Sequence, residues 1–389
     1  MIKPIAALVA ALALSLSAAH AQDHVKVGLI ATLSGPPAVI GQQLRNGFML
    51  AVKTLGGKLG GRDADVVVAD DQLKPDVAVG KARELVERDK VDFVVGPVFS
   101  NILAAIMRPI TSAGVILISP NAGSSAFASK HCNPNFFVTS YQNDQVFEVL
   151  GQYAQDSGIK KVIIIVPNYQ AGKDAAAGFK HKFAGRILDE IYMPLGQLDY
   201  SVELSRIAAA KPNAIFAFLP GGMGINFVKQ FRQAGLAGKI TFLSAFTVDE
   251  STLPAQGDAA LGMYGGANWA PNVDNPQNKA FVTAYEKAYG GTVPATYAFQ
   301  AYDAAMLIDS AVRAVHGNLS DKAALRAALK KADFKSLRGK FKFNNNHYPI
   351  QDFYLVKVAK RPDSKYETEI VKKVFSNYAD SYAKDCLMK

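Results

Sequence analysis

Short apolar runs alternate with longer segments of helical periodicity along most of the chain. The first run, 25–29, predicts a strand, and the apolar spacing over 44–55 predicts a helix that ends at Gly56-Gly57. This alternation is typical of βαβ units, in which helices cover a parallel sheet. The series continues with strands over 66–68, 93–95 and 115–118 and with helices that begin at 75 and 100.

A second series begins near residue 145 and repeats the alternation, so we expect a chain of the α/β class with two lobes. Its helices are predicted over 145–156, 171–184 and 223–234, and its strands over 162–166, 214–218 and 240–243. The remaining predicted elements are helices over 277–289, 297–315 and 321–332 and a strand over 353–356.

The composition fits a large globular protein. Of 389 residues, 49% are hydrophobic and 20% are charged, which excludes a disordered chain and a coiled coil. The formal net charge is +10, but Lys and Arg are dispersed along the chain, as they are from Lys357 to Lys373, and predict a solvated surface. Aromatic residues are not interleaved with basic ones, so no nucleic-acid partner is expected.

The N-terminus has the features of a secretory signal over residues 1–21. Lys3 precedes a mostly apolar run, and the segment ends at Ala19-His20-Ala21. We therefore expect a periplasmic protein. Cys132 and Cys386 are either two separate thiols or one disulfide, and export to an oxidising compartment favours the disulfide.

Polar turns follow two of the predicted strands, at the edge of the sheet where open α/β proteins bind ligands. Gly96–Ser100 leads into a helix, and Ser119–Ser125 follows the next strand. Hydroxyls and free amides at a helix N-terminus attract anions, so the two turns together predict a carboxylate site. The alternative is that Ser100 only caps its own helix.

No catalytic or metal constellation is evident. After the signal segment is removed, the histidines no longer contain a pair with metal-ligand spacing. No nucleophile elbow, phosphate-binding loop or dinucleotide fingerprint follows a predicted strand, and Asp70-Asp71 has no partner base. We therefore expect neither an enzyme nor a cofactor or metal.

Several short motifs together resemble the periplasmic leucine/isoleucine/valine-binding proteins of ABC importers. They are Leu33-Ser34-Gly35-Pro36, Gly60-Gly61-Arg62, Asp70-Asp71, Val95-Gly96-Pro97 with Ser100, Ile118-Ser119-Pro120 and Tyr302-Asp303-Ala304. The resemblance implies a type I periplasmic binding protein fold, in which two doubly wound lobes are joined by three crossings. It also implies a monomer that delivers its ligand to a membrane permease.

The resemblance places the crossings near residues 142, 271 and 350. Lobe one would then be 25–142 plus 272–350, and lobe two would be 143–271 plus 351–389. In this family the positions of Ser100, Asn121, Ala122 and Gly123 hold the ligand carboxylate. The positions that line the rest of the cleft correspond here to Ile40, Phe99, Tyr169, Gly221, Phe246 and Tyr297.

The chain departs from the amino-acid binders where they hold the ligand ammonium. Their acid is replaced by Phe246, a threonine by Gly123, and a tyrosine by Pro220 or Gly221. A buried ammonium without these acceptors is costly, whereas an aromatic ring would pack on Phe246 and Tyr297. We therefore expect an aromatic carboxylate of the benzoate or hydroxycinnamate kind.

Three further observations bear on this expectation. The segment 343–352 resembles the aromatic-acid-binding branch of the family, and a ring hydroxyl would need a partner such as Gln145, Asn168 or Tyr169. Phe246 and Tyr297 could instead be ordinary core residues. The competing hypotheses are a branched-chain amino-acid binder that uses Asp249 or Glu250, and a secreted α/β enzyme.

Overall fold

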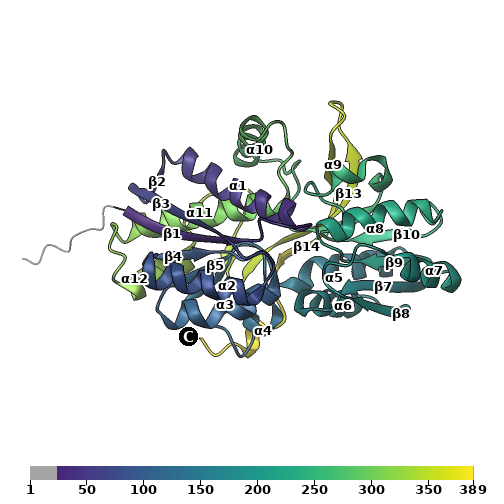
Figure 1. Cartoon of the computed structure of the whole chain (residues 1–389), viewed down its shortest axis with the longest axis horizontal. Coiled ribbons are helices and arrows are strands. Elements are labelled where there is room, and N and C mark those ends of the chain that lie inside the picture. Colours follow the sequence, from purple (N-terminus) through teal and green to yellow (C-terminus); the bar gives the residue numbers. More distant parts are fainter. Residues whose placement is uncertain (1–23, 389) are drawn as a thin grey trace, which may run out of the picture.

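The computed structural model describes residues 24–388, so the predicted signal segment lies outside the described residues. Two α/β lobes, each built on its own sheet, lie next to each other along the long axis of the molecule (Figure 1). Within the described range, no helix is both long enough and apolar enough to cross a membrane.

Lobe one contains a six-stranded sheet in the order β2-β3-β1-β4-β5-β6, parallel except for the pair of β2 with β3. Its strands are β1 (His24–Ala31), β2 (Lys58–Leu59), β3 (Arg62–Asp70), β4 (Phe93–Val95), β5 (Ile116–Ser119) and β6 (Phe136–Val138). Its helices are α1 (Ala38–Thr54), α2 (Pro75–Arg83) with a π-helical turn (Glu84–Arg88), α3 (Ser100–Ser112), α4 (Ser125–Ala128), α10 (Pro276–Ala288), α11 (Thr296–Ala314) and α12 (Lys322–Lys331).

Lobe two contains an eight-stranded sheet in the order β12-β13-β11-β10-β9-β7-β8, with β14 paired to β13. The strands of this sheet that belong to lobe two are β7 (Lys161–Pro167), β8 (Arg186–Met193), β9 (Ala214–Ala217), β10 (Thr241–Ser244), β11 (Tyr264–Ala267), β13 (Pro349–Lys360) and β14 (Tyr366–Tyr378). The short β12 (Lys342–Phe343) pairs with the start of β13, where the chain leaves lobe one. Its helices are α5 (Asn143–Asp156), α6 (Gln170–His181), α7 (Ser201–Ala210), α8 (Gly222–Gln233), α9 (Leu253–Gln256) and a 3-10 turn (Gly257–Ala260).

Several strands that the apolar runs predicted are buried on both faces, but β3, predicted from 66–68, is not, because Val67 and Val68 are exposed. All three residues of β4 are buried, and so are residues 162–167 of β7. Parallel strands covered by helices on both sides carry continuous apolar sequences, which is why these elements were predicted. The elements that were not predicted include β8, α7 and β14, each of which has an exposed face, and the short β6, which is fully buried. β14 contains part of the segment from Lys357 to Lys373, which predicted only a solvated surface.

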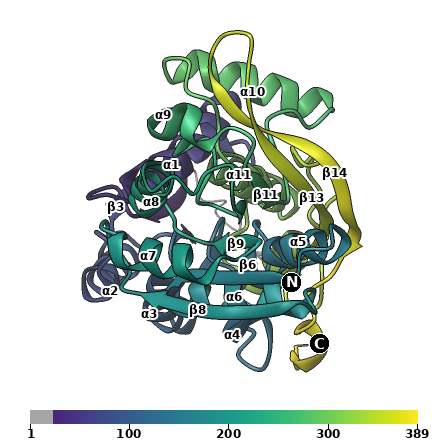
Figure 2. The same ribbon diagram turned by 90° about the vertical axis from the view of Figure 1, so that its right-hand side faces the viewer.

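The chain passes between the two sheets in three places: between β6 and α5, between β11 and α10, and at the start of β13. We propose that the lobe boundaries lie at these passages. The long β13–β14 hairpin of lobe two extends toward α10 of lobe one (Figure 2). There Glu286 pairs with Arg361 at 2.5 Å and with Lys365 at 3.0 Å.

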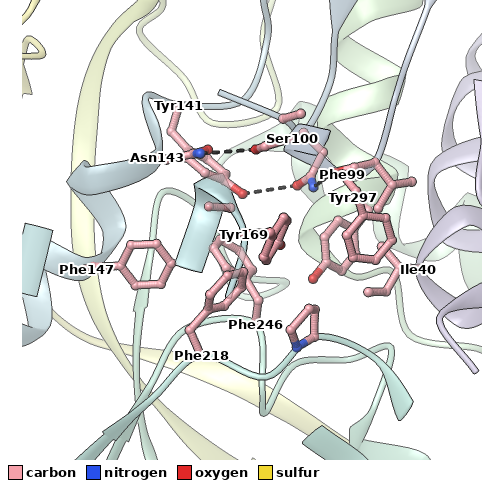
Figure 3. Close-up of a pocket in the computed structure, with 15 residues that line it drawn as sticks. Ile40, Phe99, Ser100, Tyr141, Asn143, Phe147, Tyr169, Phe218, Phe246 and Tyr297 are labelled. Carbon is pink, nitrogen blue, oxygen red and sulfur yellow. Dashed lines mark hydrogen bonds between the residues drawn. The ribbon is translucent and has the colours of Figure 1, made fainter. Parts of the chain in front are cut away.

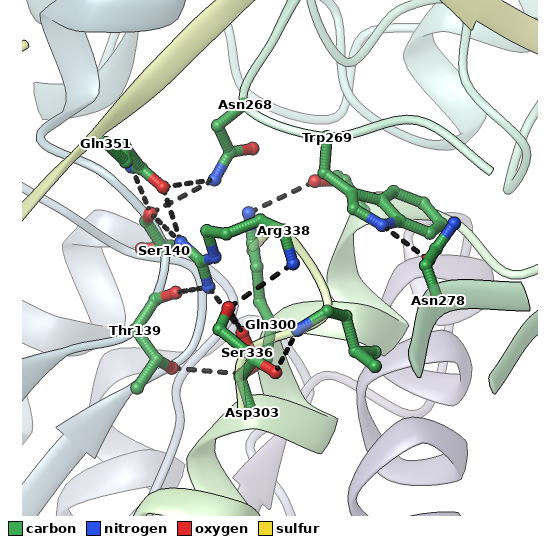
Figure 4. A network of polar contacts seen from close by, with 12 residues as sticks. Thr139, Ser140, Asn268, Trp269, Asn278, Gln300, Asp303, Ser336, Arg338 and Gln351 are labelled. Carbon is green, nitrogen blue, oxygen red and sulfur yellow. Dashed lines mark hydrogen bonds and ion pairs between the residues drawn. The ribbon is translucent and has the colours of Figure 1, made fainter. Parts of the chain in front are cut away.

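One buried cluster connects the three passages (Figure 4). The carbonyl oxygen of Ser140, after β6, accepts hydrogen bonds from Arg338 Nη1 at 3.1 Å, Asn268 Nδ2 at 3.1 Å and Gln351 Nε2 at 2.7 Å. Arg338 in turn pairs with Asp303 of α11 at 3.1 Å, and both side chains are almost completely excluded from solvent. Each passage is therefore fixed to the other two and to lobe one.

The C-terminal tail departs from the predicted division, which assigned all of 351–389 to lobe two. Cys386 forms a disulfide with Cys132 in lobe one, with Cα atoms 5.8 Å apart. Asp380 accepts a hydrogen bond from Asn346 at 3.2 Å, in the turn before β13. The tail returns to lobe one because this covalent bond and these polar contacts hold it there.

Candidate functional site

A cavity lies between the lobes, beyond the carboxyl ends of strands from both sheets (Figure 3). The empty space between its lining residues is about 380 Å³, which includes space open to solvent. The ends of parallel strands meet at this edge, so turns from both lobes contribute side chains. The lining residues are Ile40, Val98, Phe99, Ser100, Asn121, Ala122, Tyr141, Asn143, Phe147, Tyr169, Ala171, Phe218, Pro220, Phe246 and Tyr297.

Ser100 forms the polar end of the cavity on lobe one. It is the first residue of α3, and the preceding N-cap residue, Phe99, makes no side-chain cap, so Ser100 is not the capping residue of this helix. Its Oγ accepts a hydrogen bond from Asn143 Nδ2 at 3.2 Å, and no described residue accepts the hydroxyl hydrogen in return. The free amides of the first helical turn add partial positive charge, so this end suits an anion.

Gly96 sets the path of the turn that carries Ser100. Its backbone has φ of +132°, and a Cβ atom there would lie 2.1 Å from the carbonyl oxygen of Ile30 in β1. Only glycine fits this close approach between the chain after β4 and β1. The turn can therefore leave the sheet at once and present Phe99 and Ser100 to the cavity.

Phe246 is the centre of the apolar end, on lobe two. Its ring stacks on Tyr141 with centroids 5.4 Å apart, and Phe147 at 6.1 Å, Phe218 at 6.2 Å and Tyr297 at 6.1 Å surround it. The backbone of Phe246 is left-handed, with φ of +63°. A bulky residue rarely adopts this conformation, which costs about 1–3 kcal/mol and is found at binding and active sites.

Tyr169 closes the cavity from lobe two. Its ring lies 6.3 Å from Phe99 of lobe one and 6.3 Å from Phe218 of lobe two, measured between centroids. Burial raises the pKa of the Tyr169 hydroxyl, and the nearby Asp174 carboxylate raises it further. The hydroxyl is therefore neutral and can donate a hydrogen bond.

Comparison with known proteins identifies the family. A family model described as "Periplasmic binding protein" matches residues 24–364. The chain belongs to this family. It is 33% identical over 368 residues to the Leu/Ile/Val-binding protein homolog 6 of Brucella melitensis, which covers 92% of this chain and 93% of that relative.

Solved structures of periplasmic binding proteins match the fold closely. A solute binding protein of an ABC transporter from R. palustris, crystallised with benzoate, is 32% identical with a TM-score of 0.88, over 94% of this chain and 99% of that one. A second, from Rhodopseudomonas palustris BisB5 in complex with 3,4-dihydroxy benzoic acid, is 33% identical with a TM-score of 0.86, over 92% and 99%. The protein is thus a type I solute-binding protein of the ABC transporter class.

Most residues predicted from the sequence line the cavity of this periplasmic binding protein; Gly123 and Gly221 do not. The Gly123 amide donates to Asn143 Oδ1 at 3.0 Å, so it supports Asn143. Gly221 precedes α8, and a Cβ atom on it would lie 3.2 Å from Cα of Pro37 in the other lobe. Gly221 therefore belongs to the contact between the lobes, and Pro220 lines the cavity in its place.

Asn121 and Ala122 line the cavity, but the Asn121 side chain is already engaged. Its Nδ2 donates to the Val98 carbonyl at 2.6 Å, and its Oδ1 accepts from the Tyr141 hydroxyl at 3.1 Å. Asn121 thereby holds the turns after β4 and β5 together. Gln145, considered for a ring hydroxyl, instead bonds the backbone of Gln142 and does not line the cavity.

Seven lining residues are not among those predicted from the sequence. Phe147 and Phe218 read as core positions of a helix and a strand, and buried aromatic residues look the same in sequence whether they face a core or a cavity. The sequence identifies Pro220 only as one of two positions where the amino-acid binders have a tyrosine. The omitted residues are Val98, Tyr141, Asn143, Phe147, Ala171, Phe218 and Pro220.

None of the residues that line this cavity is acidic or basic. Asp249 accepts hydrogen bonds from the Ser251 amide at 2.8 Å and from the Tyr297 hydroxyl at 3.1 Å. Glu250 accepts from the Thr368 amide at 2.7 Å. Burial raises the pKa of both carboxyls, that of Glu250 to about 8. Both acids lie behind the cavity wall and already have partners.

Metal ligation finds no support in the described range. In residues 24–388, no three His, Cys, Asp or Glu side chains are grouped so that they could hold a metal ion.

Proposed function

We propose that this solute-binding protein captures a small aromatic carboxylate, of the benzoate or hydroxycinnamate kind, and delivers it as a monomer to the permease of an ABC importer. Binding requires no chemical step and no cofactor. The lobes close around the ligand, and the ligand stabilises the closed form because it contacts both of them.

One observation carries the proposal: the cavity has hydrogen-bond donors at one end, aromatic rings at the other and no acid. A carboxylate fits Ser100 and the first amides of α3, while the ring packs against Phe246 and Tyr297. An amino acid would bring an ammonium that no lining carboxylate could pair with, at a cost of several kcal/mol. The neighbours crystallised with benzoate and 3,4-dihydroxy benzoic acid support the same ligand class.

The Brucella relative favours a second candidate, because its name assigns leucine, isoleucine and valine. That function would require Asp249 to leave Ser251 and Tyr297 and reach the cavity. The two candidates therefore differ in a measurable way, since only the second predicts stabilisation by aliphatic amino acids.

A thermal-shift panel tests the proposal. Benzoate, 4-hydroxybenzoate and 4-hydroxycinnamate are compared with leucine and isoleucine. A ligand at 100 times its Kd stabilises the folded state by about 2.7 kcal/mol, which raises Tm clearly. We expect stabilisation by at least one aromatic acid and none by leucine; the reverse pattern would exclude the proposal.

Substitution of Phe246 locates the site. Phe246→Glu places a carboxylate against the ligand ring at the apolar end of the cavity, and we expect a loss of affinity of roughly 100-fold, about 2.7 kcal/mol. Phe246→Leu keeps an apolar wall and removes only the ring, and should weaken binding by about 2- to 10-fold. Unchanged affinity in both variants, measured by calorimetry, would show that the ligand binds elsewhere.

A further inference from the structure

Asp174 connects the polar end of the cavity to the contact between the lobes. It lies on α6 of lobe two, and its side chain is 4% exposed. Its Oδ1 accepts from the hydroxyl of Ser125 at 2.7 Å and from Gln170 Nε2 at 2.8 Å. Its Oδ2 accepts from Asn143 Nδ2 at 2.8 Å and from the amide of Ser125 at 3.3 Å.

Neutral donors satisfy this buried carboxylate, and no cation is paired with it in residues 24–388. A buried charge without a counterion needs such donors, because each replaces water that the group has lost. Ser125 begins α4 of lobe one, so two of the four hydrogen bonds exist only while the lobes are closed. In the closed form, hydrogen bonds from protein groups therefore stabilise the Asp174 carboxylate. When the lobes separate, Asp174 loses the two hydrogen bonds from Ser125.

The same carboxylate fixes the orientation of the Asn143 amide. Asn143 directs its NH2 group to Asp174 and to Ser100 Oγ at 3.2 Å, and its oxygen to the amide of Gly123 at 3.0 Å. A flipped amide would place its oxygen against the Asp174 carboxylate and its NH2 against the Gly123 amide. Both contacts would be repulsive, so only the observed orientation is favourable.

This orientation determines what Ser100 can do. Its Oγ accepts a hydrogen bond from Asn143, so its own hydrogen must point elsewhere. The cavity lies on the open side of this hydroxyl. Ser100 is thus held as a hydrogen-bond donor, which selects a ligand oxygen that carries negative charge and disfavours a donor such as an amide NH2.

We propose that Asp174 is a positioning residue that links carboxylate recognition to closure: through Asn143 it holds Ser100 as a donor to the ligand, and through Ser125 it fastens lobe two onto lobe one. This inference rests on the proposed function for the identity of the ligand. The second part of the proposal, that Asp174 fastens the lobes through Ser125, concerns contacts within the chain and holds for any ligand of the cleft.

Three variants separate the two halves. Asp174→Asn removes the charge and replaces one accepting oxygen with an NH2 group, which meets a donor, Asn143 or Gln170, in either orientation. It should therefore disturb both. Ser125→Ala removes the hydroxyl that contacts Asp174 and leaves the contact of Asp174 with Asn143 intact. Asp156→Asn makes the same change of charge at the end of α5, where the side chain is 47% exposed, and serves as the control.

Binding of benzoate and benzamide is measured by calorimetry and stopped-flow fluorescence. In Asp174→Asn, we expect the affinity for benzoate to fall at least tenfold, mainly through faster dissociation, and the preference for benzoate over benzamide to shrink. In Ser125→Ala, dissociation should accelerate while that preference stays as in the wild type. Wild-type affinity, dissociation rate and preference in Asp174→Asn would overturn the proposal.

Hydrogen exchange of the Ser125 amide provides a readout that needs no ligand. Asp174→Asn should accelerate exchange at this amide relative to wild type and to Asp156→Asn. Equal exchange rates would overturn the fastening role, even if the wild type bound none of the aromatic acids. Failure of the wild type to bind any aromatic acid would instead contradict the proposed function, so the two failures are distinguishable.

Discussion

Arg338→Met tests the buried cluster that joins the three passages between the lobes. Methionine keeps most of the side-chain volume that packs on Phe299 and Phe341, whose ring centroids lie 4.7 and 5.0 Å from the guanidinium carbon. The substitution removes the charge that pairs with Asp303, whose side chain is 0% exposed. Asp303 then retains the Ser336 hydroxyl at 2.5 Å as its polar contact in this cluster, together with one backbone amide.

Removing one partner of a buried ion pair costs about 3–5 kcal/mol, because the other charge stays buried without compensation. We expect this loss in the free energy of unfolding, measured by urea denaturation at pH 8. Burial raises the pKa of Asp303, and Arg338 opposes that rise. Without Arg338 the folded-state pKa rises further above the unfolded value, so the variant loses stability as pH increases. The penalty should therefore be smaller at pH 5 than at pH 8.

Two controls make the result decisive. Arg313→Met breaks an ion pair with Asp309 on the same helix, but the Arg313 side chain is 63% exposed, so the loss should be about 0–1 kcal/mol. Arg338→Met combined with Asp303→Asn removes both charges and should cost less than the sum of the two single changes. A loss below about 1 kcal/mol in Arg338→Met, or strict additivity in the double variant, would refute the account of this cluster.

Two further outcomes concern the disulfide of the C-terminal tail and a buried acid at the start of α5. Replacing Cys132 and Cys386 with serine should lower the free energy of unfolding by about 2–5 kcal/mol, because the disulfide closes a loop of 254 residues; equal Tm with and without reductant in the wild type would contradict this. Burial and the nearby Asp174 raise the pKa of Asp144 from 3.8 to about 7. Between pH 3.8 and about pH 7 the folded protein therefore binds more protons than the unfolded chain, so the free energy of unfolding falls as pH rises through this range. Asp144→Asn should reduce this slope by up to about 1.4 kcal/mol per pH unit in urea denaturation, and an unchanged slope would show that Asp144 is ionised throughout.

The strands that the sequence predicted best are those whose apolar sequence has a single cause, namely burial on both faces of the sheet. Parallel strands such as β4 and β7 are apolar throughout because helices cover both faces. β8 lies at the edge of its sheet, and β14 pairs only with β13, and their sequences mix apolar and charged residues without strict alternation. A mixed segment without a clear period is not distinguishable from exposed loop or helix by periodicity alone.

The candidate site also contains residues that the sequence predicted and residues that it did not. The turn that carries Ser100 was predicted, since ligands of open α/β sheets bind where strands end. Asn143 was not predicted, because its importance comes from a tertiary arrangement: its amide lies between Ser100, Gly123 and Asp174, which come from three separate elements. Gly123 was placed in the cavity by the family resemblance, whereas in the structure it does not line the cavity and its amide donates to Asn143 Oδ1.

The contacts between the lobes fall into two groups that behave differently when ligand enters. On the cleft side, the Gly222 amide donates to the Pro36 carbonyl at 3.2 Å, and Ser125 bonds to Asp174; water can replace these partners when the lobes separate. At the passages, Arg338 and its partners are buried, and breaking them would leave a charge without compensation. We therefore expect that opening breaks the first group and leaves the second intact as the pivot. Because each hydrogen bond of the first group contributes only about 0.5–1.5 kcal/mol net, a bound ligand that contacts both lobes can decide which form prevails.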